Sequence, residues 1–461
     1  MDSGQTARCV LCGSDTSAPR CAGACSSSRA TQEESMREDG IVGAPRRVVV
    51  VGAGVVGLST AWFLQEHGVE VTVVDRRDVA SGASWGNAGY VAPGFSVPLP
   101  EPAVLRYGLR ALLDRDAPLS VPASPDLGLW SFLLRFAAHC TTRSWSRSMR
   151  ALAAVNEEAL EAFDALRGVA EPPRPTTVTV AFEQAADADG LRREFEMMRR
   201  CGQDVDVTEP PVSTVEVPQL SARIGAVLRV AGQRFVAPGE FTRALADAVV
   251  ARGGTIRRGF DVVGLSPGTG GAGRPGGRAA GDVVVKSRDG HRMSADEVVL
   301  ATGAWLSRLA GPLGVRVPVR AGRGYSFTVP TREPVPGPIY LPGVRVACTP
   351  YQDGLRVAGT MEFRDPDAPV DTRRIEAIVR SARPLLSGVR WDERSDEWGG
   401  PRPVTPDGLP LVGRTRMAGV HVAGGHGMWG LTLGPVTGRL LAERIATGKT
   451  PDALRPFDPL R

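Results

Sequence analysis

The sequence predicts an α/β fold in which a parallel sheet is interleaved with an α+β region built on a largely antiparallel sheet. Two observations carry the prediction. A valine-rich strand, a glycine turn, a helix and a second strand follow one another over residues 47–75. Much later, strand patterns at residues 319–329, 345–349 and 355–359 follow one another without helices between them, which is typical of antiparallel pairing.

The first unit places Gly52, Gly54 and Gly57 between a strand of four valines and a helix that ends near Gly68. Gly52 permits a tight turn, Gly54 lets the backbone approach a pyrophosphate, and Gly57 lets helix and strand pack closely. The N-terminus of the helix offers free N–H groups and a partial positive charge to phosphates. The unit therefore predicts dinucleotide binding, and an ordinary strand, turn and helix with chance glycines is the alternative. The expected contacts are Gly52, Gly54, Val55, Val56 and Gly57.

Asp75 closes the second strand and is expected to accept hydrogen bonds from the ribose hydroxyls of the adenosine half. A carboxylate at this place disfavours a 2′-phosphate, which argues against NADP in spite of Arg76 and Arg77. Arg76 is included among the expected cofactor contacts. FAD and NAD both remain open on this fingerprint.

The composition is that of an ordinary globular protein of two or three domains, with 461 residues, 42% of them hydrophobic and 23% charged. The net charge of +5 comes mostly from arginines spread along the chain, so no nucleic-acid partner is expected. No stretch reaches the roughly twenty apolar residues of a membrane span. The apolar segment 127–138 is expected to be a core helix, with peripheral membrane contact as the alternative. We expect a cytoplasmic protein, with a peripheral position at the inner face of the membrane as the alternative.

Four of the seven cysteines, Cys9, Cys12, Cys21 and Cys25, lie in the first 25 residues. Their spacing could hold zinc or an iron–sulfur cluster, or form disulfides, but the residues around them offer nothing to fold around a metal. We therefore expect a disordered tail, or an over-long reading frame whose true start is Met36, and no metal site.

Besides the first unit, three further blocks of sequence stand out. They are the small-residue loop 81–90 (SGASWGNAGY), the strand end 301–305 (ATGAW), and residues 398–408 (WGGPRPVTPDG) followed by the turn 424–430 (GGHGMWG). Together, over about residues 46–448, these blocks resemble the D-amino-acid oxidase superfamily of FAD enzymes, and in particular its small-subunit type of bacterial D-amino acid dehydrogenase. One departure is Pro401, where the family usually carries leucine or a similar residue.

The resemblance implies a Rossmann-like FAD-binding domain of the GR2 or D-amino-acid oxidase type, interleaved with an α+β substrate domain. FAD is favoured over NAD because the chain leaves after the first unit and returns only near residues 235 and 400, whereas an NAD enzyme would continue directly into the second half of the domain. The expected segments are a disordered or non-native tail (1–45), three FAD-binding segments (46–100, 235–315 and 396–448), two substrate-domain segments (101–234 and 316–395) and a C-terminal tail (449–461).

The resemblance also implies substrate and proton roles. Arg402 is expected to bind a substrate carboxylate, since a guanidinium pairs with it bidentately, and pairing with Asp407 or with backbone carbonyls is the structural alternative. The turn 424–430 is expected to face the pyrimidine edge of the flavin, where N–H groups and a helix dipole stabilise the reduced anion. His426 in this turn is either a proton carrier or a residue that shapes the turn. Pro435 is expected in the first turn of the last helix.

The remaining expected contacts are less specific. The loop 81–90 offers small residues that can pass close to a flat ring, with a simple surface loop as the alternative. Cys348, Tyr351 and Met361 are placed on the substrate side by family position, with core packing as the alternative. Expected cofactor contacts outside the first unit are Ser84, Asn87, Ala88, Gly89, Val263, Thr302, Gly303, Gly427, Met428, Trp429, Gly430 and Leu431.

The implied reaction is the oxidation of a D-amino acid or a related amine acid. Hydride passes from the α-carbon to flavin N5, and the imine hydrolyses to a 2-oxo acid and ammonia. This chemistry needs orientation and charge placement more than an obligate acid–base residue. The electron acceptor stays open between oxygen, a quinone and a protein carrier. The alternatives are a glycine- or sarcosine-type secondary amine oxidase, a non-catalytic FAD-bound subunit of a larger complex, and a plain NAD-dependent dehydrogenase.

Overall fold

The structure is a computed structural model that describes residues 45–104, 119–121, 125–268 and 282–461. Residues 43–461 form one compact unit. The predicted cysteine tail and residues 269–281, which are rich in glycine, lie outside the described residues. In the described part of the chain, no helix is long and apolar enough to cross a membrane, and no group of His, Cys, Asp or Glu side chains is arranged to hold a metal ion.

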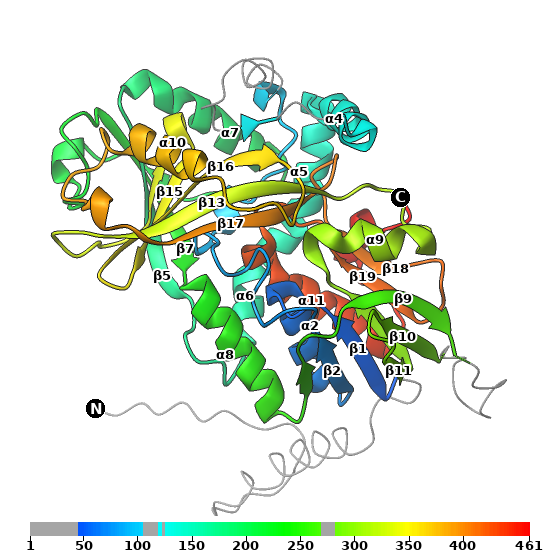
Figure 1. Ribbon diagram of the computed structural model, residues 1–461. Coiled ribbons are helices and arrows are strands. Elements are labelled where there is room, and N and C mark those ends of the chain that lie inside the picture. Colours follow the sequence, from blue (N-terminus) through cyan, green and yellow to red (C-terminus); the bar gives the residue numbers. More distant parts are fainter. Residues whose placement is uncertain (1–44, 105–118, 122–124, 269–281) are drawn as a thin grey trace, which may run out of the picture. The chain divides into compact units, whose positions relative to one another are not determined.

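A six-stranded sheet forms around the valine-rich opening strand, and segments far apart in the sequence lie side by side in it (Figure 1). It is parallel except for the antiparallel pair β18–β19 at one edge. The strand order is β18 (Leu411–Arg414), β19 (Val420–Gly424), β12 (Glu297–Leu300), β1 (Arg47–Val51), β2 (Glu70–Val74) and β8 (Thr255–Arg257). The predicted α/β fold with a nucleotide-type parallel sheet is confirmed.

Both faces of this sheet are covered by other elements. Side chains on both sides of β1 are therefore buried, which explains its run of four valines. One face packs against α2 (Val55–Glu66), α8 (Pro238–Ala251) and α11 (Gly430–Thr447). The other packs against a small antiparallel sheet of β9 (Val262–Pro267), β10 (Val283–Ser287) and β11 (Arg292–Ala295), and against α9 (Leu306–Ala310).

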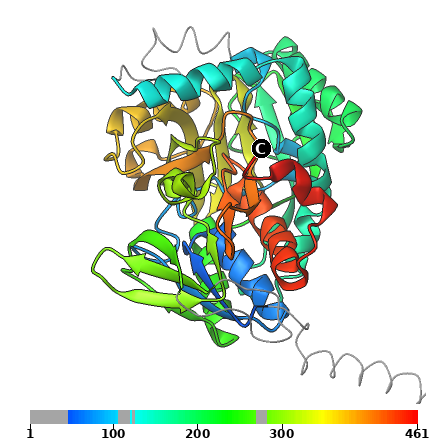
Figure 2. The same cartoon turned by 90° about the vertical axis from the view of Figure 1, so that its right-hand side faces the viewer.

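Helices α2 and α11 cross closely, as the blue and red helices in Figure 2 show. A methyl group at Gly438 would lie 2.7 Å from the backbone nitrogen of Thr60. The prediction that Pro435 lies in the first turn of α11 is wrong, because the helix begins at Gly430 and Pro435 is its sixth residue. Proline there leaves one helical carbonyl without its donor, and burial of the helix against α2 keeps it helical nonetheless.

The second large sheet has ten strands and is mostly antiparallel, as predicted. Its main path is β17 (Ser395–Val404), β13 (Arg320–Pro330), β16 (Gly354–Phe363), β15 (Val346–Tyr351), β14 (Ile339–Leu341), β5 (Arg174–Phe182), β7 (Ala226–Phe235) and β3 (Tyr90–Val91). The short strands β4 (Leu119–Ser120) and β6 (Val207–Thr208) pair with β16 and β7. The β14–β5 and β16–β4 pairs are parallel.

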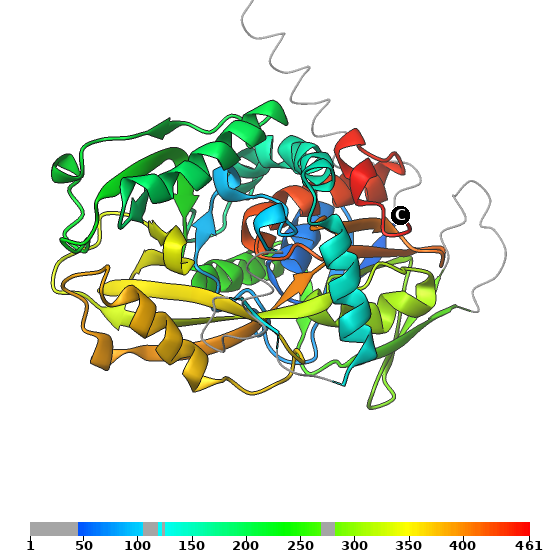
Figure 3. The ribbon, with the colours of Figure 1, turned by 90° about the horizontal axis from the view of Figure 1, so that it is seen from above.

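Helices flank this second sheet. α10 (Thr372–Ala382) packs on the apolar face formed by β13, β15 and β16. The apolar segment 127–138, predicted to be a helix, lies in α4 (Leu127–His139), and α5 (Thr142–Glu157), α6 (Ala159–Asp164) and, later, α7 (Ala188–Arg200) follow it. In the view from above, the cyan helix α4 lies on the face of the molecule that is turned toward the viewer (Figure 3).

Candidate active site

A cavity of about 430 Å³ lies at the carboxyl ends of β1, β2 and β12. This is the edge at which open parallel sheets bind their ligands. Loop 81–90, β17 and the turn 424–430 also contribute to its walls. The lining includes the predicted residues Gly52, Gly54, Val55, Val56, Asp75, Arg76, Ser84, Asn87, Val263, Thr302, Gly303, Arg402, His426, Gly427, Gly430 and Leu431.

The glycine turn after β1 is packed too closely for any side chain. Gly52 has a φ of +119°, and a methyl group on it would lie 2.4 Å from the carbonyl oxygen of Ala301. A methyl group at Gly57 would lie 2.0 Å from the carbonyl oxygen of Gly52. Gly57 does not line the cavity, and it serves the close packing of α2 against the turn.

Asp75 is fixed at the end of β2 by two backbone donors. Its Oδ2 accepts from the Ala53 N–H (2.9 Å) and its Oδ1 from the Arg77 N–H (2.8 Å). A carboxylate oxygen has room for a second donor, so each can still accept from a ligand hydroxyl. This geometry suits the ribose of a dinucleotide.

The walls offer polar groups that a bound phosphate or flavin could use. The buried hydroxyl of Thr302 has no hydrogen-bond partner among the described residues. Gly54 stands before the first residue of helix α2 and offers no side-chain cap, and the first turn of the helix has no acidic residue. Ser84 Oγ accepts from the Val55 N–H (3.1 Å), which holds the loop 81–90 against this helix end. The residues present therefore fit a dinucleotide cofactor.

Asp367 binds the side chains of three residues that line the cavity, Arg76, Arg77 and Trp305, and was missed by the sequence analysis. It lies between β16 and α10, and its Oδ1 accepts from Arg76 (2.7 Å) and Arg77 (3.1 Å). Its Oδ2 accepts from Trp305 Nε1 (2.9 Å), and the Arg76 guanidinium lies 4.0 Å from the centre of the Trp305 ring. Burial opposes ionisation of Asp367, but the hydrogen bonds from Arg76 and Trp305 outweigh it and hold the pKa of this carboxyl below its ordinary value.

Replacing Asp367 by asparagine is expected to weaken FAD binding about fivefold, because Arg76 and Trp305 lose the acceptor that holds them at the cavity wall. The partners are partly exposed, so we assign the pairs about 1 kcal/mol in total. The loss should shrink as salt is added. Fluorescence titration of the apoprotein with FAD measures the effect. Asp392→Asn is the control, since it removes an exposed ion pair with Arg383 (3.2 Å) elsewhere. Equal affinities of the two variants for FAD would show that the contacts of Asp367 do not support cofactor binding.

Arg402 reaches the cavity from β17 as a cation without a counter-ion. Its Nη1 donates to the carbonyl oxygen of Thr360 (3.2 Å), and no carboxylate of the described residues pairs with it. Burial alone lowers the pKa of Arg402 to about 10, so the guanidinium stays charged at neutral pH. A half-buried cation that lacks a counter-ion is costly, and a carboxylate ligand would supply the counter-ion.

The geometry around Arg402 leaves its side chain little freedom. A methyl group at Gly324 would lie 2.2 Å from Cζ of Arg402, so the guanidinium lies directly over the bare backbone of β13. Thr360 holds a φ of +51°, which is rare for a β-branched residue and marks a strained backbone. Its carbonyl is the one that accepts from Arg402.

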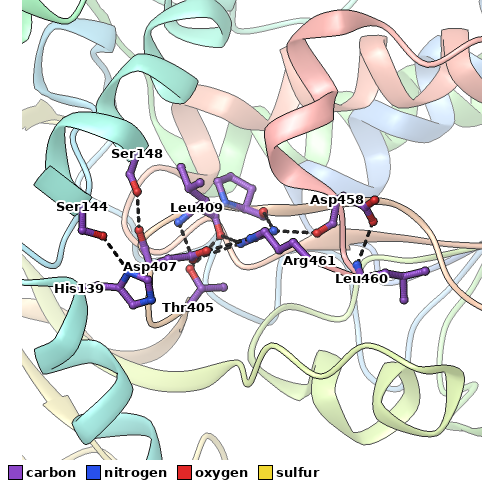
Figure 4. A network of polar contacts seen from close by, with 10 residues as sticks. His139, Ser144, Ser148, Thr405, Asp407, Leu409, Asp458, Leu460 and Arg461 are labelled. Carbon is purple, nitrogen blue, oxygen red and sulfur yellow. Dashed lines mark hydrogen bonds and ion pairs between the residues drawn. The ribbon is translucent and has the colours of Figure 1, made fainter.

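The alternative partner of Arg402, Asp407, is engaged elsewhere (Figure 4). Arg461 donates to both of its oxygens, from Nε (2.8 Å) and from Nη2 (3.1 Å). The Asp407 backbone carbonyl accepts from Ser148 (3.1 Å). The structural alternative for Arg402 is thus reduced to the single bond to the Thr360 carbonyl.

The turn 424–430 joins β17 through the Gly427 N–H, which donates to the Pro403 carbonyl (2.8 Å). His426 in this turn is 4% exposed, and its Nε2 lies 3.0 Å from the Thr437 hydroxyl of α11. Burial lowers the pKa of His426 to about 4, so the ring is neutral at physiological pH. These contacts favour the turn-shaping role over proton transfer.

Eight predicted site residues do not line the cavity, and Gly57 is one of them. Cys348 is fully buried in the core of the ten-stranded sheet, and Met361 packs in the core beneath α4. Tyr351 donates to Glu240 (3.2 Å), and the Trp429 indole donates to the Val97 carbonyl (2.7 Å). The remaining three are Gly89, Met428 and Ala88. The Ala88 carbonyl accepts from the Thr349 hydroxyl.

Trp398 is a cavity residue that the sequence analysis quoted only as part of a motif. A methyl group at Gly86 would lie 2.2 Å from its ring, and one at Gly400 would lie 1.7 Å from it. The indole is therefore packed against two glycines, one from loop 81–90 and one from its own strand. The WGG spacing was the available signal, but which face Trp398 occupies depends on the pairing of β17 with β13.

The fold and the site together define a dinucleotide-binding oxidoreductase. A family model described as FAD dependent oxidoreductase matches residues 47–444, and one described as pyridine nucleotide-disulphide oxidoreductase matches residues 5–84 only. A protein of Xanthobacter autotrophicus named D-amino acid dehydrogenase is 32% identical over 416 residues, which are 88% of this chain and 96% of the relative. The chain therefore belongs to the FAD-dependent oxidoreductase family, and its cofactor is FAD.

Solved structures share the fold at low identity. Glycine oxidase of Bacillus cereus aligns with a TM-score of 0.64 and 20% identity, covering 88% of this chain and 96% of that one. L-α-glycerophosphate oxidase of Mycoplasma pneumoniae, solved with FAD bound, aligns with a TM-score of 0.66 and 16% identity, covering 88% and 95%.

Proposed function

We propose that this chain oxidises a D-amino acid to its imine, which water converts to a 2-oxo acid and ammonia. The observation that carries the proposal is the Arg402 guanidinium, which lines the cavity without a carboxylate partner among the described residues. The relatives named D-amino acid dehydrogenase, at 32% identity over most of the chain, support the substrate class.

In the proposed reaction, Arg402 binds the substrate carboxylate and fixes the orientation of the α-carbon. The C–H bond at that carbon breaks with its electron pair, and the amine nitrogen loses a proton as the C=N bond forms. FAD, when bound, supplies the two-electron acceptor. Neutral His426 holds the turn 424–430 to Thr437 of α11.

Residues at both ends of the cavity would hold the cofactor. Asp75 would accept from the ribose, the glycine turn and the start of α2 would face the pyrophosphate, and the turn 424–430 would face the pyrimidine edge. The FAD-binding domain would comprise segments 46–100, 235–315 and 396–448, and the substrate domain segments 101–234 and 316–395. Strand β17 belongs to the ten-stranded sheet while its residues 398 and 401–403 line the cavity, so it joins the two parts.

Anaerobic mixing with matched D- and L-amino acids tests the proposal, with bleaching of the flavin absorption as the readout. D-enantiomers should reduce the flavin at least about tenfold faster than their L-forms. Faster reduction by glycine or sarcosine would favour the secondary amine oxidase, which the glycine oxidase fold also accommodates. A yellow protein that no amino acid reduces would identify a non-catalytic FAD subunit.

A further inference from the structure

Arg356 is a buried cation on β16 whose polar partners lead toward the cofactor cavity. Its side chain is 3% exposed, whereas the side chain of its ion-pair partner, Asp396, is 39% exposed. A buried guanidinium is costly to remove from water, and a buried ion pair often stabilises a fold no more than apolar side chains of similar volume would. The presence of Arg356 within the sheet therefore calls for a role other than packing.

One arm of the Arg356 guanidinium reaches loop 81–90 through a serine. Nη2 of Arg356 donates to the Ser326 hydroxyl (3.0 Å), and Ser326 donates to the carbonyl oxygen of Gly86 (2.8 Å). A guanidinium has only donors, so the Ser326 oxygen accepts from Arg356 and the hydroxyl hydrogen is left for Gly86. Arg356 thus fixes the direction in which the Ser326 hydrogen points.

The other arm of the guanidinium holds the preceding residue of the same loop. Nη1 of Arg356 pairs with the Asp396 carboxylate, which also accepts from the Trp85 indole (3.3 Å). Asp396 has a φ of +48°, which is uncommon for a residue other than glycine. Arg356 is therefore connected through one intermediate side chain to each of two consecutive loop residues, Trp85 and Gly86.

The stretch of loop that these contacts hold forms part of the cavity wall. Ser84, Gly86 and Asn87 line the cavity. Gly86 also packs against the ring of Trp398, another lining residue, so closely that a methyl group on it would lie 2.2 Å from that ring. A displacement of Gly86 would therefore move both the loop and Trp398.

We propose that Arg356 is a positioning residue for FAD. Through Ser326 and Asp396 it holds loop 81–90 in the conformation that receives the cofactor. Arg356 does not itself line the cavity, so it acts through these neighbours. FAD is the cofactor whichever substrate the chain oxidises, so the inference is independent of the proposed reaction.

Ser326 and Thr328 provide a matched pair of variants to test this. Both hydroxyls are buried on β13 and accept from Arg356, at 3.0 Å and 3.1 Å, and Ser326 is the one that continues to the loop. Ser326→Ala should weaken FAD binding about tenfold, whereas Thr328→Val should change it by less than about twofold. Fluorescence titration of the apoprotein with FAD measures the affinity. The visible circular dichroism of the bound flavin should change in Ser326→Ala and stay parental in Thr328→Val.

A double-variant cycle shows whether Arg356 acts through Ser326. Arg356→Met should weaken FAD binding about 50-fold in the parent protein but only about fivefold in the Ser326→Ala background, where one of the two routes is already lost. Parental FAD affinity of Ser326→Ala, equal losses in the two hydroxyl variants, or additive effects of Arg356→Met and Ser326→Ala would each overturn the inference. Thermal unfolding of the FAD-free variants gives their stabilities, and losses of FAD affinity that merely follow stability would overturn it as well.

Discussion

Replacing Arg402 by methionine is expected to lower kcat/KM for amino acid substrates by about 30-fold to 5,000-fold, which corresponds to about 2–5 kcal/mol. Methionine keeps the apolar length of the side chain and removes the charge. The substrate carboxylate would then enter a buried site that offers no cation in exchange for water. Steady-state kinetics on the best substrate of the amino acid panel measures the loss.

Two comparisons make this result specific to the guanidinium. Gly324→Ala should produce a smaller loss of the same kind, because its methyl group would displace Cζ of Arg402 from a distance of 2.2 Å. Arg320 lies on β13, the strand of Gly324, and is paired with Asp126 (2.8 Å), so Arg320→Met should keep the parental kcat/KM. FAD content and thermal unfolding would confirm that all three variants are folded. Parental efficiency of Arg402→Met on every carboxylate substrate would remove Arg402 from substrate binding.

The sequence was sufficient for those parts of the fold whose signal is local. The buried strand, the glycine turn and the alternating strands each occupy a short window, and the separated blocks implied that distant segments return to one sheet. The structure brings most of the predicted cofactor residues into one cavity, together with Arg402 and His426. Such residues are recognisable because backbone approach requires glycine and ribose binding requires an acid, whatever the rest of the chain does.

Positions that depend on strand register were beyond sequence reasoning. Cys348 and Tyr351 lie on β15, where a shift of one residue exchanges the two faces of the strand. The structure directs Cys348 into the core, where burial raises the pKa of its thiol to about 12. Trp429 lies within the turn 424–430, but its indole donates to the Val97 carbonyl and does not line the cavity.

Contacts between distant segments were equally out of reach. Asp367 reaches Arg76 across 291 positions of the chain, and nothing near it in the sequence marks it as a cofactor neighbour. Gly324 leaves the space that the Arg402 side chain fills, and Arg402 comes from the adjacent strand β17. Even Pro435 was placed wrongly, because local propensity disfavours proline in a second turn and only the packing of α11 against α2 overrides it.

Replacing Gly52 by alanine is expected to yield a protein that purifies without most of its FAD and loses about 2–5 kcal/mol of unfolding free energy. Alanine adopts a φ of +119° only with strain, and its methyl group would lie 2.4 Å from the Ala301 carbonyl oxygen. Relief of that contact must move the turn or the end of β12, and both line the cavity. The ratio of flavin to protein absorption and urea unfolding measure the two effects.

Gly68 provides the matched control for this variant. It also has a positive φ, +73°, but a methyl group on it would have no neighbour within 4 Å. Gly68→Ala should therefore cost only about 1 kcal/mol of backbone strain and keep its FAD. If instead Gly52→Ala retains full FAD with parental affinity, then close backbone packing at this turn does not shape the cofactor site. If both variants lose FAD alike, the cause is lower stability of the α2 unit and not the contact between Gly52 and Ala301.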